Sequence, residues 1–205
     1  MIILKSPREI ALMRAGGRLL AEVMERLRTF VKPGISTLEI DQEVDAFLLS
    51  RGAQPAFKGY RGFPATVCAS INEEVVHGIP SAGRRVKEGD IIGLDLGCVV
   101  EGYYADAAFT LAVGEIPPRV EELLNVTRES LYKGIAQCRP GRRLGDLSHA
   151  IQRHVEAHGF SVVRAFVGHG IGLALHEDPQ VPNFGEPGRG PLLKAGMVLA
   201  IEPMV

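Results

Sequence analysis

The stretch IIGLDLGC, residues 91–98, places one acid, Asp95, in the middle of an apolar strand. A similar arrangement returns 107 positions later, where the stretch VLAIE, residues 198–202, ends on Glu202. This offset aligns the two acids without a gap. A repeat of this length is not one of the short stacking periods of solenoids or propellers, so it predicts a duplicated half-domain.

The alignment at this offset extends backwards along the chain. The tripeptide KPG at 32–34 falls on RPG at 139–141, and residues 86–89 fall on residues 193–196. Apolar positions and a helix-ending glycine also coincide, in the pairs Ile40/Leu147, Val44/Ile151, Leu48/Val155 and Gly52/Gly159. We therefore expect one domain over residues 1–205, built from repeats at about 7–113 and 117–205, the second of them incomplete.

Spacing and punctuation residues define the expected elements. Ser6 before Pro7 is a helix start, and Ser36 with Glu39 is a capping box. The expected helices span about 7–30, 37–52, 119–137 and 144–158, and the expected strands span about 66–79, 91–100, 103–113, 161–167 and 197–202. Two helices followed by strands in each half predict an α+β fold, with helices laid on a central, mostly antiparallel sheet.

Composition argues against several classes of protein. The 205 residues carry 23 basic and 24 acidic side chains, so there is no net attraction to nucleic acid or to an anionic membrane. No apolar run reaches the ~18 residues of a membrane span, and residues 1–6 do not resemble a secretory signal. Cys68, Cys98 and Cys138 lie far apart, so we expect reduced thiols in a cytoplasmic protein.

Asp95 and Asp106 are expected on one face of a β-hairpin. A two-residue turn at 101–102 places Asp106 opposite Gly97, whereas a turn at 100–101 places the two acids opposite each other. Both registers leave the acids on one face, because side chains alternate with period two. Two such acids in apolar strands repel, and a divalent cation relieves that repulsion. A salt bridge or a turn cap is the alternative interpretation for either acid alone.

The six histidines fall into two groups. His149, His154 and His158 lie on an expected helix and are predicted to be solvent-exposed, because the sequence between the last two lacks the metalloprotease pattern. The other three lie where strand-like segments meet glycine or proline, and flanking glycine lets backbone and ligand approach closely; these are His77, His169 and His176. Turn-capping loop histidines are the alternative for this second group.

These motifs occur together in a known family. The chain carries NEEVVHGIP at 72–80, two acids eleven apart, GHGIG at 168–172, HEDP at 176–179 and IEPMV at 201–205. In this combination it resembles the type I methionine aminopeptidases in their bacterial form. The resemblance covers the chain from about residue 3 to the last residue. It implies a single metallopeptidase catalytic domain with the duplicated, pseudo-twofold pita-bread fold of creatinase and the aminopeptidases, whose central antiparallel sheet is covered by helices.

The resemblance also implies a site for two divalent metal ions. The expected metals are Co2+, Mn2+ or Fe2+, with Zn2+ as a further candidate. The metal ligands of the family map onto Asp95, Asp106, His169 and Glu202, with Asp106 bridging the two ions.

Substrate-binding residues are implied in the same way. His77 and His176 would contact the substrate near the scissile peptide and act as catalytic residues. Tyr60, Phe63 and Cys68 match positions around the methionine side chain, and a further wall of the pocket would come from Leu175.

The function that the resemblance implies is removal of the initiator methionine from nascent peptides by a metal-activated water. Such an enzyme would act in the cytoplasm as a monomer, at or near the ribosome, without membrane or direct nucleic-acid contact. A non-catalytic binding protein of the same fold and a proline-specific peptidase of that fold are the alternatives. The family's second bridging glutamate would fall beyond Val205, so relative to the family the chain is expected to be C-terminally truncated and weakly active or inactive.

Overall fold

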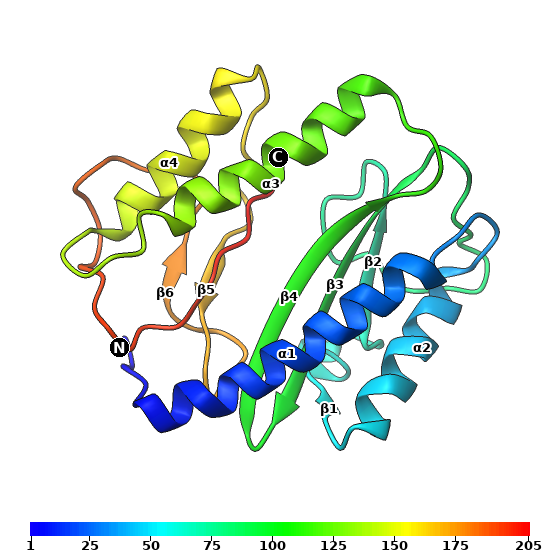
Figure 1. The fold of residues 1–205 in the computed structure, drawn as a ribbon, viewed down its shortest axis with the longest axis horizontal. Coiled ribbons are helices and arrows are strands. Elements are labelled where there is room, and N and C mark those ends of the chain that lie inside the picture. The colour runs from blue at the N-terminus through cyan, green and yellow to red at the C-terminus, as the bar shows by residue number, and fades with distance from the viewer. The chain divides into compact units, whose positions relative to one another are not determined.

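The computed structural model describes residues 1–205 and contains four α-helices, one short 3-10 helix and seven strands (Figure 1). Contacts between residues divide the chain into two compact units. Residues 11–117 form one, called here the 11–117 unit, and residues 1–10 with residues 118–205 form the other, called the second unit. None of the helices combines the length and the apolar character that a membrane crossing requires.

The 11–117 unit contains a four-stranded antiparallel sheet and two helices. The helices are α1 (Pro7–Phe30), whose first residues belong to the second unit, and α2 (Thr37–Ser50). The strands are β1 (Gln54–Pro55), β2 (Val67–Ile71), β3 (Ile91–Val100) and β4 (Tyr103–Ala112), with the 3-10 helix η1 (Tyr60–Gly62) between the first two. β3 pairs with each of the other three strands, so it is the centre of the sheet.

Both helices begin where the sequence predicts a cap. The Glu9 N–H donates to Ser6 Oγ at 3.3 Å, and the Ser6 N–H donates back to Glu9 Oε2 at 2.7 Å. Ser36 and Glu39 repeat this exchange at 3.2 and 2.9 Å. A helix leaves its first N–H groups without internal partners, so each reciprocal pair stabilises the helix start that it closes.

The core of the 11–117 unit lies between its helices and one face of the sheet. Its side chains recur every three or four residues in the helices and every second residue in β3, and Figure 1 shows α1 running across the strands. Those that are at most 1% exposed include Leu20, Val23, Leu27, Ile40, Val44, Leu48, Ile92, Leu94, Leu96 and Cys98. Burying a large aliphatic side chain contributes roughly 1.5–3 kcal/mol. The alternate residues of β3 consequently face away from this core.

The β3–β4 hairpin settles the position of the two acids. Glu101 and Gly102 form its turn with φ values of 52° and 80°, the left-handed conformation that tight hairpin turns need. The register pairs Gly97 with Asp106 and Asp95 with Ala108, which confirms the turn at 101–102 and excludes the turn at 100–101. Paired residues share a face. Both acids therefore lie on the sheet face opposite the core.

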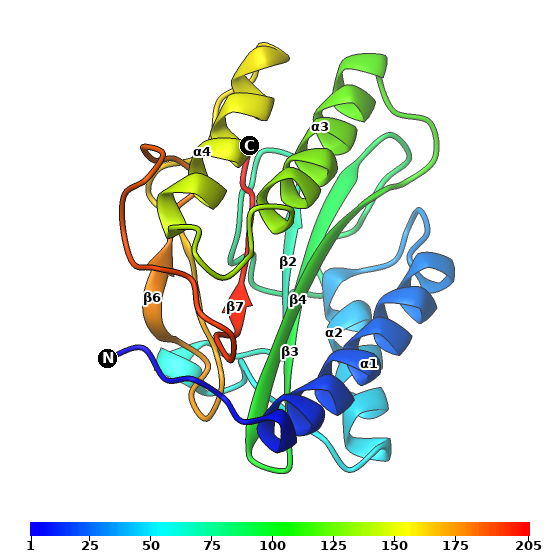
Figure 2. The same cartoon turned by 60° about the vertical axis from the view of Figure 1, so that its left-hand side comes forward.

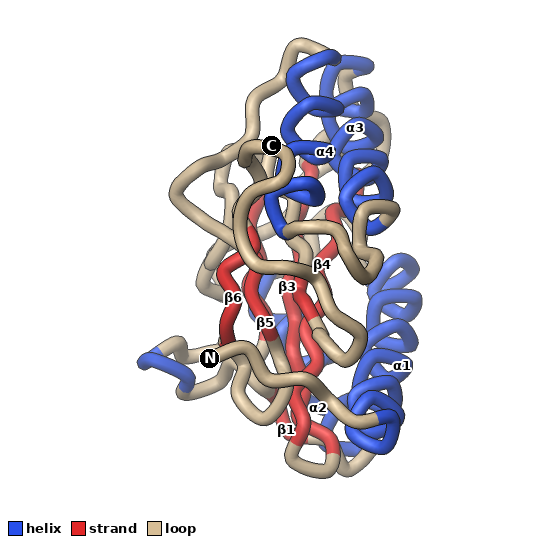
Figure 3. Tube along the Cα trace, turned by 90° about the vertical axis from the view of Figure 1, so that its left-hand side faces the viewer, coloured by secondary structure: helices blue, strands red, loops and turns tan.

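The second unit is built from two helices and three short strands. Its elements are α3 (Pro118–Ile135), α4 (Leu144–Ala157), β5 (Gly168–Gly170), β6 (Glu177–Val181) and β7 (Leu199–Ala200), and the antiparallel sheet has the order β6-β5-β7. Figure 2 shows α3 and α4 as neighbours, and their facing side chains share a core with Val181 and Val162. Most of the chain after α4 is loop, drawn in tan in Figure 3.

Backbone contacts inside the two units correspond at an offset of 107 residues. α2 spans 37–50 and α4 spans 144–157. Bonds that recur at this offset are Gly34 N–H to Val86 O and Gly141 N–H to Leu193 O, Thr37 N–H to Arg84 O and Leu144 N–H to Pro191 O, and the isolated bridges Ser36–Arg85 and Arg143–Leu192. This correspondence agrees with a duplicated fold, while the boundaries of the repeats stay a prediction.

The strand expected over 161–167 is wrong. Val162 is buried in the helical core, but the segment has no ladder partner, and its Val163 N–H donates to Met204 O. β6 forms instead at 177–181, where acids and a proline gave no strand signal. Its formation depends on pairing with β5, which a local pattern does not reveal.

The predicted exposure of the α4 histidines is only partly right. His158 is exposed, but the His154 side chain is only 13% exposed, and its Nε2 atom lies 3.1 Å from Glu129 Oε2 on α3. The reason is the packing of α3 along α4, which covers one flank of the helix.

Candidate functional site

In the 11–117 unit, the face that carries Asp95 and Asp106 is a candidate binding surface. The two acids sit on neighbouring strands, one register step apart, and each is only partly exposed. The hairpin holds them there through ladder hydrogen bonds on both sides of Gly97. The sequence prediction that the fold brings these two acids onto one surface is confirmed by the register.

Cys68 lies beside this acid face. It pairs with Asp95 across β2 and β3, so its side chain shares that face, and the residue is 4% exposed. Burial, followed by the negative charges of Asp95 and Asp106, raises the pKa of the Cys68 thiol. A neutral thiol is a weak nucleophile. Cys68 therefore suits a pocket wall and not covalent catalysis.

His77 lies in the loop that follows β2 and runs back along it. The Ala69 N–H donates to Gly78 O at 2.8 Å, and the Gly78 N–H donates to Ser70 Oγ at 3.1 Å. These bonds fix the backbone next to His77, which has a φ of 62° and an exposed side chain. A left-handed non-glycine residue costs of order 1–3 kcal/mol and needs such support.

Tyr60 and Phe63 bracket the short 3-10 turn before β2. The Phe63 N–H donates to Tyr60 O at 2.9 Å, and the Gly59 N–H donates to Phe63 O at 2.7 Å, so the two aromatic residues are held in one compact turn. Both are half-buried, as an aromatic lining would be.

In the second unit, His169 is the central residue of β5 and is 6% exposed. The glycines on either side of it permit close strand packing. A Cβ atom at Gly168 would lie 2.3 Å from Ala200 O, and one at Gly170 would lie 2.1 Å from Asp178 O. The strands on both sides thus approach β5 so closely that only glycine fits beside His169.

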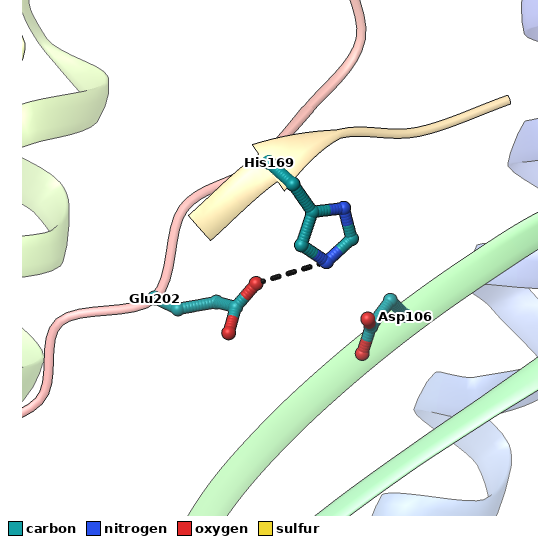
Figure 4. Close-up of side chains that lie close together, drawn as sticks. All are labelled: Asp106, His169 and Glu202. Carbon is teal, nitrogen blue, oxygen red and sulfur yellow. Dashed lines mark ion pairs between the residues drawn. The ribbon is translucent and has the colours of Figure 1, made fainter. Parts of the chain in front are cut away.

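Glu202 follows β7 and faces His169. Its Oε1 atom lies 3.2 Å from His169 Nε2, as the dashed line in Figure 4 shows, and its backbone O accepts from Asn183 Nδ2 at 2.8 Å. Figure 4 also draws Asp106 on β4. Asn183 is 1% exposed, so it anchors the chain on which Glu202 stands.

The orientation of the His169 ring indicates what this pair can bind. His169 Nδ1 lies 2.8 Å from Gly170 O, and a carbonyl oxygen only accepts, so Nδ1 carries the proton. In the neutral ring, Nε2 then presents its lone pair toward Glu202 Oε1. That oxygen is buried and makes no hydrogen bond. Two acceptors that face each other repel unless a proton or a cation lies between them. A histidine that binds a metal through one ring nitrogen typically donates a hydrogen bond from the other nitrogen to a carbonyl, as His169 does to Gly170 O.

His176 stands at the end of the loop that joins β5 to β6. It is exposed, and its ring centroid lies 4.2 Å from that of His169 at an interplanar angle of 46°. Leu175, directly before it, is 3% exposed and anchors the loop. The second unit therefore brings together His169, His176 and Glu202, as the sequence predicts.

Two structural groups near these residues were not found from the sequence. The first is Asp41 on α2, a buried acid that accepts the N–H groups of Thr66 and Val67 at 2.8 and 2.9 Å and so fixes the entry into β2. Burial raises the pKa of Asp41, and the two N–H groups oppose that rise. An acid next to the apolar helical positions 40, 44 and 48 was the available signal.

The second group is an ion pair between Lys5 and Glu177 in the second unit, whose side chains are 3% and 8% exposed. The two residues are 172 positions apart. No local pattern links them, so their contact could not be predicted from the sequence.

Comparison with known proteins supplies the class. The model of metallopeptidase family M24 matches residues 11–205. The chain therefore belongs to metallopeptidase family M24.

The similar proteins are more specific. Over 205 residues, the chain is 55% identical to methionine aminopeptidase 1 of Bacillus subtilis (strain 168), covering 100% of this chain and 82% of that protein. It is 48% identical to the solved methionine aminopeptidase of Thermotoga maritima, with a TM-score of 0.97 over 99% of this chain and 82% of that one. These matches confirm the resemblance to bacterial type I methionine aminopeptidases.

A more distant structure shares the fold alone. The prolidase from Pyrococcus furiosus is 24% identical and has a TM-score of 0.85 over 98% of this chain and 57% of that one. The duplicated pita-bread fold, with helices and antiparallel sheets in each half, is thereby confirmed.

Proposed function

We propose that this chain removes the N-terminal methionine from peptides by metal-dependent hydrolysis. The single observation that carries the proposal is the 55% identity, over the full length of the chain, to a protein named methionine aminopeptidase. Membership of a metallopeptidase family supports the use of divalent metal ions. The natural substrates would be the N-termini of newly made polypeptides.

The metal ligands in this proposal are Asp95, Asp106, His169 and Glu202. Asp106, His169 and Glu202 carry donor atoms of the kinds that could hold a metal ion. The facing lone pairs of His169 Nε2 and Glu202 Oε1 support the assignment, because a cation between them removes their repulsion. Asp95 and Asp106 repel each other on their own face in the same way.

The donor set also bears on the identity of the metal. Three carboxylates, one imidazole and no thiolate suit Mn2+, Fe2+ or Co2+ better than a soft metal, and Zn2+ accepts the same donors. We propose two ions, with Asp106 as the ligand they share. Divalent cations held there would polarise the scissile carbonyl and lower the pKa of a water molecule toward neutrality.

The remaining roles fall to side chains of this chain. His77 and His176 are exposed on loops, so each can donate a hydrogen bond to the peptide oxygen as negative charge develops on it. With Nδ1 bonded to Gly170 O, the neutral His169 ring would offer Nε2 as a metal ligand. Tyr60, Phe63 and Cys68, with a further wall from Leu175, would enclose the methionine side chain.

The setting of the enzyme is part of the proposal. We place it in the cytoplasm, as a monomer that meets nascent chains at the ribosome without contacting nucleic acid or a membrane. The three cysteines are free, which agrees with a reducing compartment. Residues 1–205 would act as one catalytic domain made of repeats at about 7–113 and 117–205.

Peptide assays with metal analysis test the function. Incubation with Mn2+ or Co2+ and a Met-Gly-type peptide should release methionine, slowly if a further ligand is required, and an Xaa-Pro peptide should stay intact. Cleavage of the Xaa-Pro peptide alone would identify a proline-specific peptidase. Absence of stoichiometric metal by elemental analysis, together with no cleavage, would identify a binding protein and overturn the proposal.

A further inference from the structure

Lys5 and Glu177 form an ion pair in the interior of the second unit. Their side chains are 3% and 8% exposed, and the Lys5 ammonium donates to Glu177 Oε2. Burying two charges is costly, and an apolar pair of similar volume would often stabilise a fold at least as well. Stability alone therefore does not account for this buried ion pair. The residues that contact it indicate a second role.

Glu177 holds the turn that leads to His176. Its Oε1 atom accepts the N–H of Leu173 at 2.9 Å and the N–H of Ala174 at 3.3 Å. Its Oε2 atom accepts a hydrogen bond from the Lys5 ammonium. One carboxylate oxygen thus binds the backbone of the turn, and the other binds Lys5.

Lys5 in turn is fixed by the chain on both sides of it. Its N–H donates to Gly196 O at 2.7 Å, and its ammonium also donates to Ile3 O at 3.3 Å. Gly196 lies just before β7, which leads to Glu202. Lys5 therefore links the start of the chain to the two segments that carry His176 and Glu202.

The turn at Gly172 lies too close to the ion pair for a side chain to fit between them. A Cβ atom at Gly172 would lie 2.4 Å from Lys5 Cε and 2.7 Å from Glu177 Oε1. The turn from Gly172 to His176 is consequently packed directly against both charged groups. We therefore expect a change in the pair to alter the turn that ends at His176.

We propose that the Lys5–Glu177 ion pair positions His176 for the reaction, by holding the 172–176 turn so that the His176 ring stays against His169. The inference rests on the proposed function, in which His176 contacts the reacting peptide. Lys5 and Glu177 touch neither substrate nor metal in this view. They act through the loop, as positioning residues.

The first test compares Lys5→Met with Lys133→Met, the same change at an exposed lysine of α3. Mutation of a residue that holds an active-site group in place typically costs 10–100-fold in activity. Lys5→Met should lower kcat for a Met-Gly-type peptide by about 10–100-fold with KM nearly unchanged, since the loop aligns a group that acts on the transition state. Lys133→Met should match the parent protein. A Lys5→Met protein with the parent kcat would overturn the proposal.

A double variant separates positioning from stability. Lys5→Met with Glu177→Met replaces the buried charges by apolar groups, so thermal stability should recover relative to Lys5→Met alone. The N–H groups of Leu173 and Ala174 still lack their acceptor, so kcat should stay low. Recovery of the parent kcat together with stability would show that the pair is only structural.

Histidine NMR spectra supply a readout that needs neither metal nor turnover. In Lys5→Met, the ring signals of His176 and His169 should shift or broaden, while those of His149 and His158 on the α4 side should stay in place. Glu177→Gln keeps an acceptor for the turn and covers the case in which Lys5→Met does not fold; its shifts should be smaller but on the same two rings. Unchanged His176 signals in both variants contradict the proposal.

The two arms also separate this inference from the proposed function. If the parent protein releases no methionine under any metal, the function fails, but displacement of the His176 signals still supports the coupling of the pair to the loop. If methionine is released and neither kcat nor the His176 signals respond to the variants, the function stands and this inference fails.

Discussion

The β3–β4 hairpin of the 11–117 unit and the β5–β7 region of the second unit present their functional side chains by different means. Asp95 and Asp106 stand on strands of ten residues each, held by a continuous antiparallel ladder. His169 and Glu202 stand on or beside strands of three and two residues, where long-range side-chain contacts supplement a short ladder.

This difference matters because the two halves repeat the same backbone framework. The bonds that flank α2 recur around α4 at an offset of 107 residues, so the framework does not distinguish the halves. In the first half the β3–β4 ladder holds both acids, and β2 pairs with β3 beside Asp95. In the second half, Asn183 anchors the chain at Glu202, and glycine contacts seat β5 between its neighbours. Regular strand pairing thus positions the acids, whereas individual long-range contacts position the histidine and Glu202.

The largest expected effect comes from the acid half. Asp106→Ala removes the ligand proposed to be shared by two ions, so metal affinity should fall more than the 10–100-fold that outer-shell changes typically cause. Titration calorimetry with Mn2+ and elemental analysis would measure this, with Glu25→Ala, an exposed acid of α1, as the control. A variant that still retains two ions per chain would rule out the bridging role.

The next effect concerns the strand contacts of the histidine half. Gly168→Ala places a methyl group where Ala200 O lies only 2.3 Å away, so β5 and β7 must separate. Overpacking of this kind costs about 1–3 kcal/mol of unfolding free energy. Urea unfolding would measure it. In contrast, Gly17→Ala, at an open position of α1 with no atom within 4 Å, should stabilise by about 1 kcal/mol. Equal stabilities for the two variants would show that β5 tolerates looser packing.

The helix starts offer a smaller test of how alike the halves are. Ser36 accepts the N–H of Glu39 as a true cap, so Ser36→Ala should lower the unfolding free energy by about 1 kcal/mol. Arg143, its counterpart before α4, makes no side-chain cap, although its guanidinium donates to Gly190 O. Arg143→Ala should therefore cost less, as urea unfolding of both variants would reveal. A larger loss of unfolding free energy in Arg143→Ala than in Ser36→Ala would mean that the bond from Arg143 to Gly190 O stabilises the fold more than the Ser36 cap does.

The smallest effect is a dependence of stability on pH that both halves should share. The hydrogen bonds of Ser36 lower the pKa of Glu39 below its ordinary value of 4.5, and the N–H groups of Arg143 and Gly188 lower the pKa of Asp146 below 3.8. A carboxylate with a lowered pKa stabilises the fold above its ordinary value, and that stability is lost as pH falls through the folded-state pKa. Unfolding free energies should therefore decline below pH 4.5.

The variant Glu39→Gln isolates the contribution of the first half. It should flatten the decline just below pH 4.5 and leave the part below pH 3.8, to which Asp146 and Asp45, whose pKa values are both lowered, contribute. A pH profile identical to that of the parent protein would show that the hydrogen bonds between Ser36 and Glu39 do not contribute to the dependence of stability on pH.

Much of the fold could be predicted because its signals are local. Strict alternation of side chains predicted that Asp95 and Asp106 share a face, whichever of the two possible turns formed, and the structure chose the turn at 101–102. The helix starts at Ser6 and Ser36 followed from cap chemistry. The strand predicted at 161–167 failed because an apolar run can be buried under helices without a ladder. β6 was missed because its pairing with β5, not its composition, makes it a strand.

The candidate site shows the same division. Asp95, Asp106, His169 and Glu202 could be named from their motifs, because residue types that bind metal stood out against apolar or glycine-rich surroundings. Asp41 and the Lys5–Glu177 pair could not, since their roles depend on distant partners. The tautomer of His169 also required its contact with Gly170 O.

The sequence by itself determined the alternation of side chains along each strand, the starts of the helices and the identity of the groups able to bind a metal, because all of these depend on near neighbours in the chain. Only the tertiary structure decided that Lys5 meets Glu177 across 172 positions and that His169 Nε2 faces Glu202 Oε1. Such contacts arise when the chain buries its apolar surface as a whole, and that process brings together residues between which no local preference acts.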